Sequence, residues 1–135
     1  MNTAQIAKLA SASMSGSMPF PQIVSGLLGE GVESYHVDYR ALHFTFYGVS
    51  SGVVVVPLIF ERLPEIAERF DAPALRAAIL DNQKKGQAFR DFCSRAILAG
   101  VHSYHAFLRG KRVVYLGRHG DQHVEWFPGA APADV

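Results

Sequence analysis

The hexapeptide GVESYH at residues 31–36 recurs almost unchanged as GVHSYH at residues 100–105. The two copies differ only at their third residue, and they lie 69 residues apart. A match of this quality arises by chance with odds on the order of one in a few hundred in so short a chain. We therefore interpret the two hexapeptides as the mark of an internal duplication.

The agreement continues outside the hexapeptides. When the chain is shifted by 69 residues without gaps, further identities include Phe20 with Phe89, Ser25 with Ser94, Arg40 with Arg109 and Gly48 with Gly117. In each half, apolar residues recur at helical spacing just before the hexapeptide, which predicts helices over residues 21–29 and 90–99. Gly31 and Gly100 follow these helices, where a left-handed backbone is best tolerated by glycine.

Three strands are expected after each helix. Their ranges are 32–39, 42–48 and 53–58 in the first half, and 101–109, 111–117 and 122–127 in the second. Short turns rich in Gly, Ser and Asp join them, so consecutive strands must run antiparallel.

The remaining segments complete the predicted fold. Residues 62–70 and 71–86 are expected to be helical, a short helix is expected around Ile6 and Leu9, and residues 129–135 are expected to form a disordered tail. The fold class is α+β, one domain over 1–135, with internally duplicated units of a helix and a three-stranded antiparallel meander. The units span about 20–59 and 87–128, with a helical connector at about 60–86. We expect helices on one face of a six-stranded sheet with a pseudo-twofold axis, although two packed sheets also fit.

Composition limits the functional classes. The chain has 135 residues, of which 49% are hydrophobic and 19% are charged, with a formal net charge of +1. Such a balance is typical of a soluble globular protein and disfavours nucleic acid or an anionic membrane as partner. One cysteine excludes an internal disulfide, and the longest strongly apolar stretch, 52–60, is too short to span a bilayer. The N-terminus lacks the pattern of a secretory signal, so a cytoplasmic location is expected.

Two long segments resemble a known family. They are FPQIVSGLLGEGVESYHVDYRALHFTFYG at 20–48 and KKGQAFRDFCSRAILAGVHSYHAFLRGKRVVYLGRHGDQHVEWFP at 84–128. Together they are similar to a small family of uncharacterised bacterial proteins often labelled "phage envelope protein". The resemblance implies a compact α+β domain. It does not identify a catalytic residue or a cofactor. The second half departs from the pattern, because Ala106 and Phe107 replace Val37 and Asp38 of the first half.

Six residues could line a cleft between the two halves. They are Tyr35, His36, Asp38, Tyr104, His105 and Arg109. Strand alternation places His36 and Asp38 on one face, where a carboxylate beside an imidazole suits general acid–base chemistry. The alternative is that the histidines face solvent or a subunit interface, and that Tyr35 and Tyr104 are core residues.

A second candidate site lies at the last hairpin. His119 and His123, with Glu125 or Asp121 as the oxygen ligand, would give a mixed nitrogen and oxygen site for zinc or another divalent ion. We favour exposed hairpin histidines, and hence neither metal nor cofactor, because no third fixed ligand is identifiable. Alternation also predicts that His102 shares the face of Tyr104 and lies opposite His105, which argues against chelation by that pair.

Two functional hypotheses follow. The first is a non-catalytic module that binds an unknown small molecule or protein and forms a homodimer, because the outer edges of meanders are commonly covered by pairing. It involves no membrane, and nucleic acid is disfavoured as a partner. The alternative is a small metal-dependent or acid/base enzyme that uses the histidines of the cleft or of the last hairpin.

Overall fold

The computed structural model describes residues 1–133. The described residues form four helices and six strands in the order α1 (Thr3–Ser15), α2 (Phe20–Gly29), β1 (Val32–Asp38), β2 (His43–Gly48), β3 (Val53–Pro57), α3 (Ala72–Lys85), α4 (Phe89–Leu98), β4 (Val101–Phe107), β5 (Arg112–Gly117) and β6 (Gln122–Trp126). The last two residues of the tail expected at 129–135 lie outside this range. Within it, none of the helices combines the length and the apolar character needed to cross a membrane.

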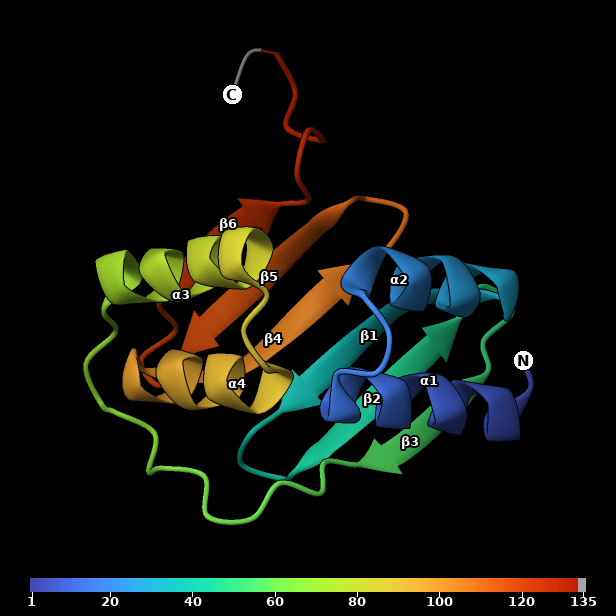
Figure 1. Cartoon of the computed structure of the whole chain (residues 1–135), viewed down its shortest axis with the longest axis horizontal. Helices are drawn as coiled ribbons and strands as arrows, with labels where there is room; N and C mark the ends of the chain where they lie inside the picture. The colour runs from blue at the N-terminus through green and yellow to red at the C-terminus, as the bar shows by residue number, and fades with distance from the viewer. Residues whose placement is uncertain (134–135) are drawn as a thin grey trace.

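All six strands belong to one sheet with the order β3-β2-β1-β4-β5-β6. Every neighbouring pair is antiparallel, including the central pair of β1 and β4 that joins the two halves. The four helices cover one face of this sheet (Figure 1). The predicted α+β class with helices on an antiparallel sheet is thus confirmed, and the choice between one sheet and two is settled in favour of one.

The two halves match element by element. α2 and α4, β1 and β4, β2 and β5, and β3 and β6 each begin and end 69 residues apart. Irregularities recur at the same offset, since the strand register shifts after Val32 and again after Val101. Leu42 and Lys111, which immediately precede the second strand of each unit, both have a left-handed φ, 59° and 54°. The strand order therefore has a pseudo-twofold axis between β1 and β4.

The repeat extends to α1 and α3. The Asn2 side chain accepts a hydrogen bond from the backbone N–H of Gln5 at 3.0 Å, and Asp71 accepts one from Ala74 at 3.0 Å, so both helices begin with the same cap. The two capping residues are 69 residues apart. The buried residues that follow them have the same offset, namely Ile6, Leu9 and Ala10 in α1 and Leu75, Ala78 and Ile79 in α3. The helix α3, expected as part of a connector, is thus the counterpart of α1.

The prediction of a helix over 62–70 is wrong. This segment contains no helical turn and runs past the C-terminal end of α4 to α3 (Figure 1). Pro64 disfavours a helical backbone at the residue before it and lacks an amide donor. The backbone N–H of Ala67 instead donates to the carbonyl of Ile97 at 3.2 Å, and that of Asp71 donates to Ala99 at 2.8 Å. Leu63, Ile66 and Phe70, which suggested an apolar helix face, do pack against the core.

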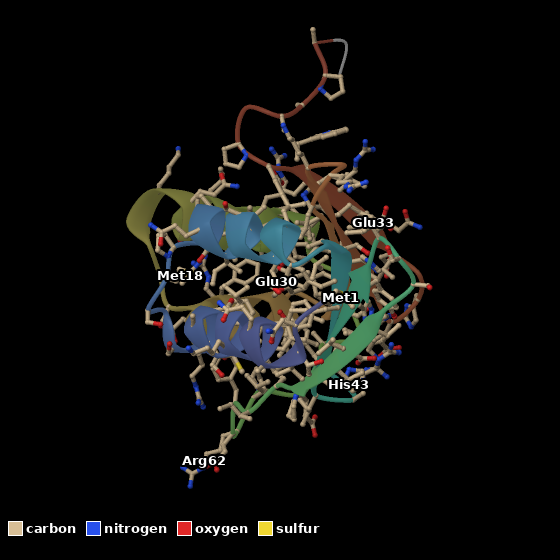
Figure 2. All side chains as sticks on the ribbon, turned by 90° about the vertical axis from the view of Figure 1, so that its right-hand side faces the viewer. Met1, Met18, Glu30, Glu33, His43 and Arg62 are labelled. Carbon is tan, nitrogen blue, oxygen red and sulfur yellow. The ribbon has the colours of Figure 1, made fainter. Side chains whose placement is uncertain are left out.

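The core lies between the helices and one face of the sheet. The strands contribute large buried side chains, namely Tyr35, Val37, Phe44, Phe46, Tyr104 and Tyr115. The helices close over them with Ile6, Leu27, Leu75 and Ile97. The other face carries no helix among residues 1–133, and Figure 2, in which His43 is labelled on that side, shows it from the edge of the sheet. We call it the open face.

The two repeat-related glycines allow a matched test of the packing against the connector. Gly31 and Gly100 have φ values of +81° and +95°. A Cβ at Gly100 would clash with the carbonyl oxygen of Arg69 and lie 2.9 Å from the Cα of Phe70, whereas at Gly31 it meets nothing closer than 4.0 Å. Gly31→Ala should therefore cost about 1–2 kcal/mol for the backbone conformation alone. Gly100→Ala should cost about 1–3 kcal/mol more for the overlap, measured by urea unfolding. Equal losses would contradict this packing.

Candidate functional site

The open face is built from three rows of side chains, with one residue from each strand in each row. In the order β3 to β6 across the sheet, the middle row is Val55, Thr45, His36, His105, Val114 and Val124. The flanking rows are Val53, Tyr47, Ser34, Phe107, Arg112 and Trp126, and Pro57, His43, Asp38, Ser103, Leu116 and Gln122. Successive side chains of a strand point to opposite faces, so the tyrosines and phenylalanines between these positions enter the core.

The pseudo-twofold axis passes between two imidazoles. His36 and His105 face each other across β1 and β4, and they are also equivalent residues of the two repeats. No other register pair between these strands joins a residue to its own equivalent, so this pair marks the axis. The ring centroids are 5.7 Å apart. The hexapeptides that reveal the duplication thus meet at the centre of the open face.

His105 sits in an aromatic environment. Its ring stacks on Phe107 with centroids 4.5 Å apart and on Tyr47 with centroids 5.8 Å apart. Its Nε2 is hydrogen-bonded to Ser34 Oγ at 2.9 Å. These contacts hold the imidazole in one orientation against an apolar surface.

The surroundings of His36 have diverged from this pattern. Asp38 and Leu116 occupy the positions equivalent to Phe107 and Tyr47. Ser103, the equivalent of Ser34, is 1% exposed, and its Oγ has no hydrogen-bond partner in the described structure. The two halves of the open face are therefore similar in backbone but different in chemistry.

The Asp38 carboxylate is hydrogen-bonded within the turn between β1 and β2. Its Oδ1 accepts hydrogen bonds from the backbone N–H groups of Arg40 at 2.8 Å and Ala41 at 3.0 Å, and Arg40 Nε lies 3.5 Å away. Burial alone would raise the pKa of Asp38, but these two hydrogen bonds and the Arg40 charge outweigh it, and the pKa is lowered. Asp38 is therefore a turn-forming carboxylate and makes no hydrogen bond to His36.

Both central histidines are held in their neutral form. Burial lowers the pKa of His36, and the negative charge of Asp38 only partly opposes this effect. Burial also lowers the pKa of His105, and the neighbouring His36 adds to the decrease. At neutral pH the middle of the open face consequently carries two uncharged imidazoles.

The expected position of His102 is wrong. Alternation predicted that it would share the face of Tyr104, but the register shift between Val101 and Ser103 inserts one residue. Val101 and Tyr104 are both buried in the core, whereas His102 is half-buried. Burial and then the charge of Arg40 lower the pKa of His102, while Asp38 raises it, which places this imidazole with the groups of the open face.

The six residues predicted to line one cleft do not come together. His36, Asp38 and His105 lie on the open face, whereas Tyr35 and Tyr104 contact each other in the core with ring centroids 6.4 Å apart. Burial raises the pKa of both tyrosines well above the ordinary value. Arg109 follows β4 and is exposed. The tyrosines are core residues, as the alternative reading held, and the sheet itself separates them from the histidines.

The predicted metal ligands of the last hairpin also do not converge. His119 Nε2 lies 3.5 Å from Glu68 Oε1, and His123 Nε2 lies 2.9 Å from Glu125 Oε1 on the helical side of β6. Among residues 1–133 there is no group of three or more His, Cys, Asp or Glu side chains that could hold a metal ion. Cys93 is a buried helix residue whose pKa is raised to about 12 by burial.

The apolar character of the open face was not predicted from the sequence. Its exposed members are Val53 and Val55 (both 57%), Val124 (44%), and Tyr47 and Phe107 (both 38%). One signal was present, because the run VVVV in β3 has no polar residue on either face. No family model and no curated protein matches the chain.

The lowered pKa values predict a loss of stability in acid. Because the folded histidines bind protons less readily than the unfolded ones, stability is fully present above about pH 6.5 and falls as the pH drops below it. The double variant His36→Gln, His105→Gln should show a smaller decrease in unfolding free energy between pH 7 and pH 5 in urea titrations. His119→Gln, at an exposed imidazole, is the control and should keep the wild-type decrease. An unchanged pH dependence in the double variant would contradict the assignment.

Proposed function

We propose that this protein is a non-catalytic binding module whose open face docks against a protein surface. The observation that carries the proposal is a broad sheet face, rich in exposed apolar and aromatic side chains, that no helix of residues 1–133 covers. Contiguous apolar surface of this kind is rare on a monomer without a binding role.

The charge distribution supports a protein partner. Of the eighteen positions in the three rows, only two are Asp, Glu, Lys or Arg, namely Asp38 and Arg112. The Asp38 carboxylate accepts a hydrogen bond from the backbone of its own turn. The Arg112 guanidinium lies over the Trp126 ring, 4.0 Å from its centroid. Centres of protein interfaces show the same depletion of charge together with aromatic and Arg enrichment.

The shape of the face disfavours a small molecule. Small-molecule sites are concave and enclose most of the ligand. The described cavities lie on the helical side, one beneath α1 and α2 beside Tyr35 and Phe46, and one between α1 and Phe60. Neither of these two cavities is lined by a residue of the three rows, and a sheet face suits a partner with an extended surface.

One observation favours the enzymatic alternative. The 2.9 Å hydrogen bond between Ser34 Oγ and His105 Nε2 joins a hydroxyl to a neutral imidazole, which is the pairing of a nucleophile with a general base. Asp38, the one carboxylate in the three rows, is hydrogen-bonded to its own turn and interacts with His36. Ser34 is also buried by its neighbours, which leaves little access for a substrate. The binding module is therefore the better-supported function.

Two further expectations from the sequence belong with this proposal. We place the protein in the cytoplasm, for which a single, buried cysteine is suitable because it needs no oxidising environment. We also propose membership of the bacterial family often labelled "phage envelope protein", which implies no activity that would conflict with a binding role.

Site-specific photocrosslinking tests the proposed surface. The photoreactive residue p-benzoylphenylalanine would replace Val124 or Tyr47 on the open face, or Leu98 on α4 as an apolar control that is more exposed than either. We expect covalent protein adducts from the first two positions and none from the third, detected as mass-shifted bands after irradiation of cells that express the full chain. Irradiation that gives no adduct at Val124 or Tyr47 would refute a protein-binding open face.

A further inference from the structure

We infer that the occupant of the open face is a second copy of this chain, packed sheet to sheet about a twofold axis that runs nearly parallel to the strands. This inference rests on the proposed function and names the partner. It replaces pairing of the outer strand edges, on which the sequence-based expectation of a homodimer relied, with stacking of the two open faces.

The area of the face suits such a dimer. Strands lie about 4.8 Å apart and residues advance about 3.4 Å, so six strands of about five residues cover on the order of 400 to 500 Å² in projection. The relief of the side chains makes the accessible area larger than this projection. A standard interface buries roughly 800 Å² per partner.

The symmetry of the sheet makes the face self-complementary. Its pseudo-twofold axis is normal to the sheet at His36 and His105, and a true twofold axis in the plane between two sheets is perpendicular to it. Together, these two axes relate the four repeats of the dimer by approximate 222 symmetry. Two sheets stacked in this way lie about 10 Å apart with strands inclined by about 30°. The central histidines of both copies then meet in the middle of the interface.

The position of Arg112 favours a dimer twofold axis that runs along the strands. In that arrangement β3 lies over the partner's β6, β2 over its β5 and β1 over its β4, and each residue faces a residue of the same row. Arg112 therefore faces the partner's Tyr47, and Val55 faces the partner's Val124. The guanidinium gains an aromatic ring in place of water. An axis across the strands would set Arg112 against the partner's Leu116, which provides no favourable contact for a charge.

The histidines make this dimer sensitive to acid. His36 and His105 would be buried further on association, and the groups that face them are Asp38, Arg40, His43 and His102, with Arg112 in the flanking row. Asp38 is negative, but its carboxylate is engaged by the turn, and Glu33, the exposed repeat equivalent of His102, is the other acidic residue on this side of β1 (Figure 2). Protonation of His36 and His105 in acid would therefore add two positive charges per copy to an interface in which Asp38 is already engaged. We expect the dissociation constant, measured by sedimentation equilibrium, to rise as the pH falls from 7 to 5. An affinity independent of pH would contradict the central position of the histidines.

The decisive experiment measures oligomeric state with charge variants of the full, tag-free chain. Wild type should sediment at neutral pH with twice the 14.8 kDa mass of the chain. Val55→Lys and Val124→Glu should each raise the dissociation constant on the order of 100-fold or more, because each places a charge in the interface of both copies. The control Leu98→Glu, on the exposed surface of α4, should leave it unchanged. Circular dichroism and urea unfolding would establish that all variants fold.

The double variant Val55→Lys, Val124→Glu tests the axis. If β3 faces the partner's β6, each new lysine lies near a new glutamate, and the double variant should dimerise again. Failure of this rescue, when each single variant is monomeric, overturns the axis along the strands. A dimer that survives Val124→Glu, or a wild type that stays monomeric at the highest soluble concentration, overturns the second copy as occupant. Crosslinked adducts of a different protein at Val124 would then preserve the proposed function, whereas the lack of any adduct would end both.

Discussion

The ladder between β1 and β4 is the constraint on which the rest of the structure depends. It is the strand pairing that joins the two repeats into one sheet, and its register places Tyr35 and Val37 opposite Ala106 and Tyr104. A slip of one residue would turn these core side chains to solvent and bring the histidines under the helices. The same register sets His36 against His105, so the centre of the core and the centre of the open face are fixed by one set of hydrogen bonds.

Duplication explains why one face of the sheet lacks helices. Each unit places its two helices on the same side of its three strands, and the pseudo-twofold axis is normal to the sheet, so it keeps all four helices on that side. An antiparallel sheet tolerates one uncovered face when that face is polar. Here Val53, Val55 and Val124 remain exposed on it. The feature that most needs a functional explanation is therefore a direct result of how the fold was assembled.

The sequence predicted the strands and most helices because the repeat supplied each assignment twice. It failed at residues 62–70, where apolar spacing imitates a helix that Pro64 prevents, and at His102, where a bulge interrupts the alternation. The site could be predicted only in part. Alternation separates His36 from Tyr35, but it cannot tell which face the helices cover. That choice depends on packing between segments far apart in the chain, which no local pattern records.

The divergence of the two halves becomes meaningful when the faces are stacked. Within one chain, the aromatic surroundings of His105 and the more polar surroundings of His36 lie side by side. An axis along the strands sets the His105 half of one copy against the partner's His36 half, so that unlike surfaces meet twice. If both halves had the sequence of the second, only the middle row would face its own kind, and Arg112 would meet the equivalent of Leu116 in place of Tyr47. A duplicated sheet whose halves have changed in different ways can thus fit itself better than an exactly repeated one.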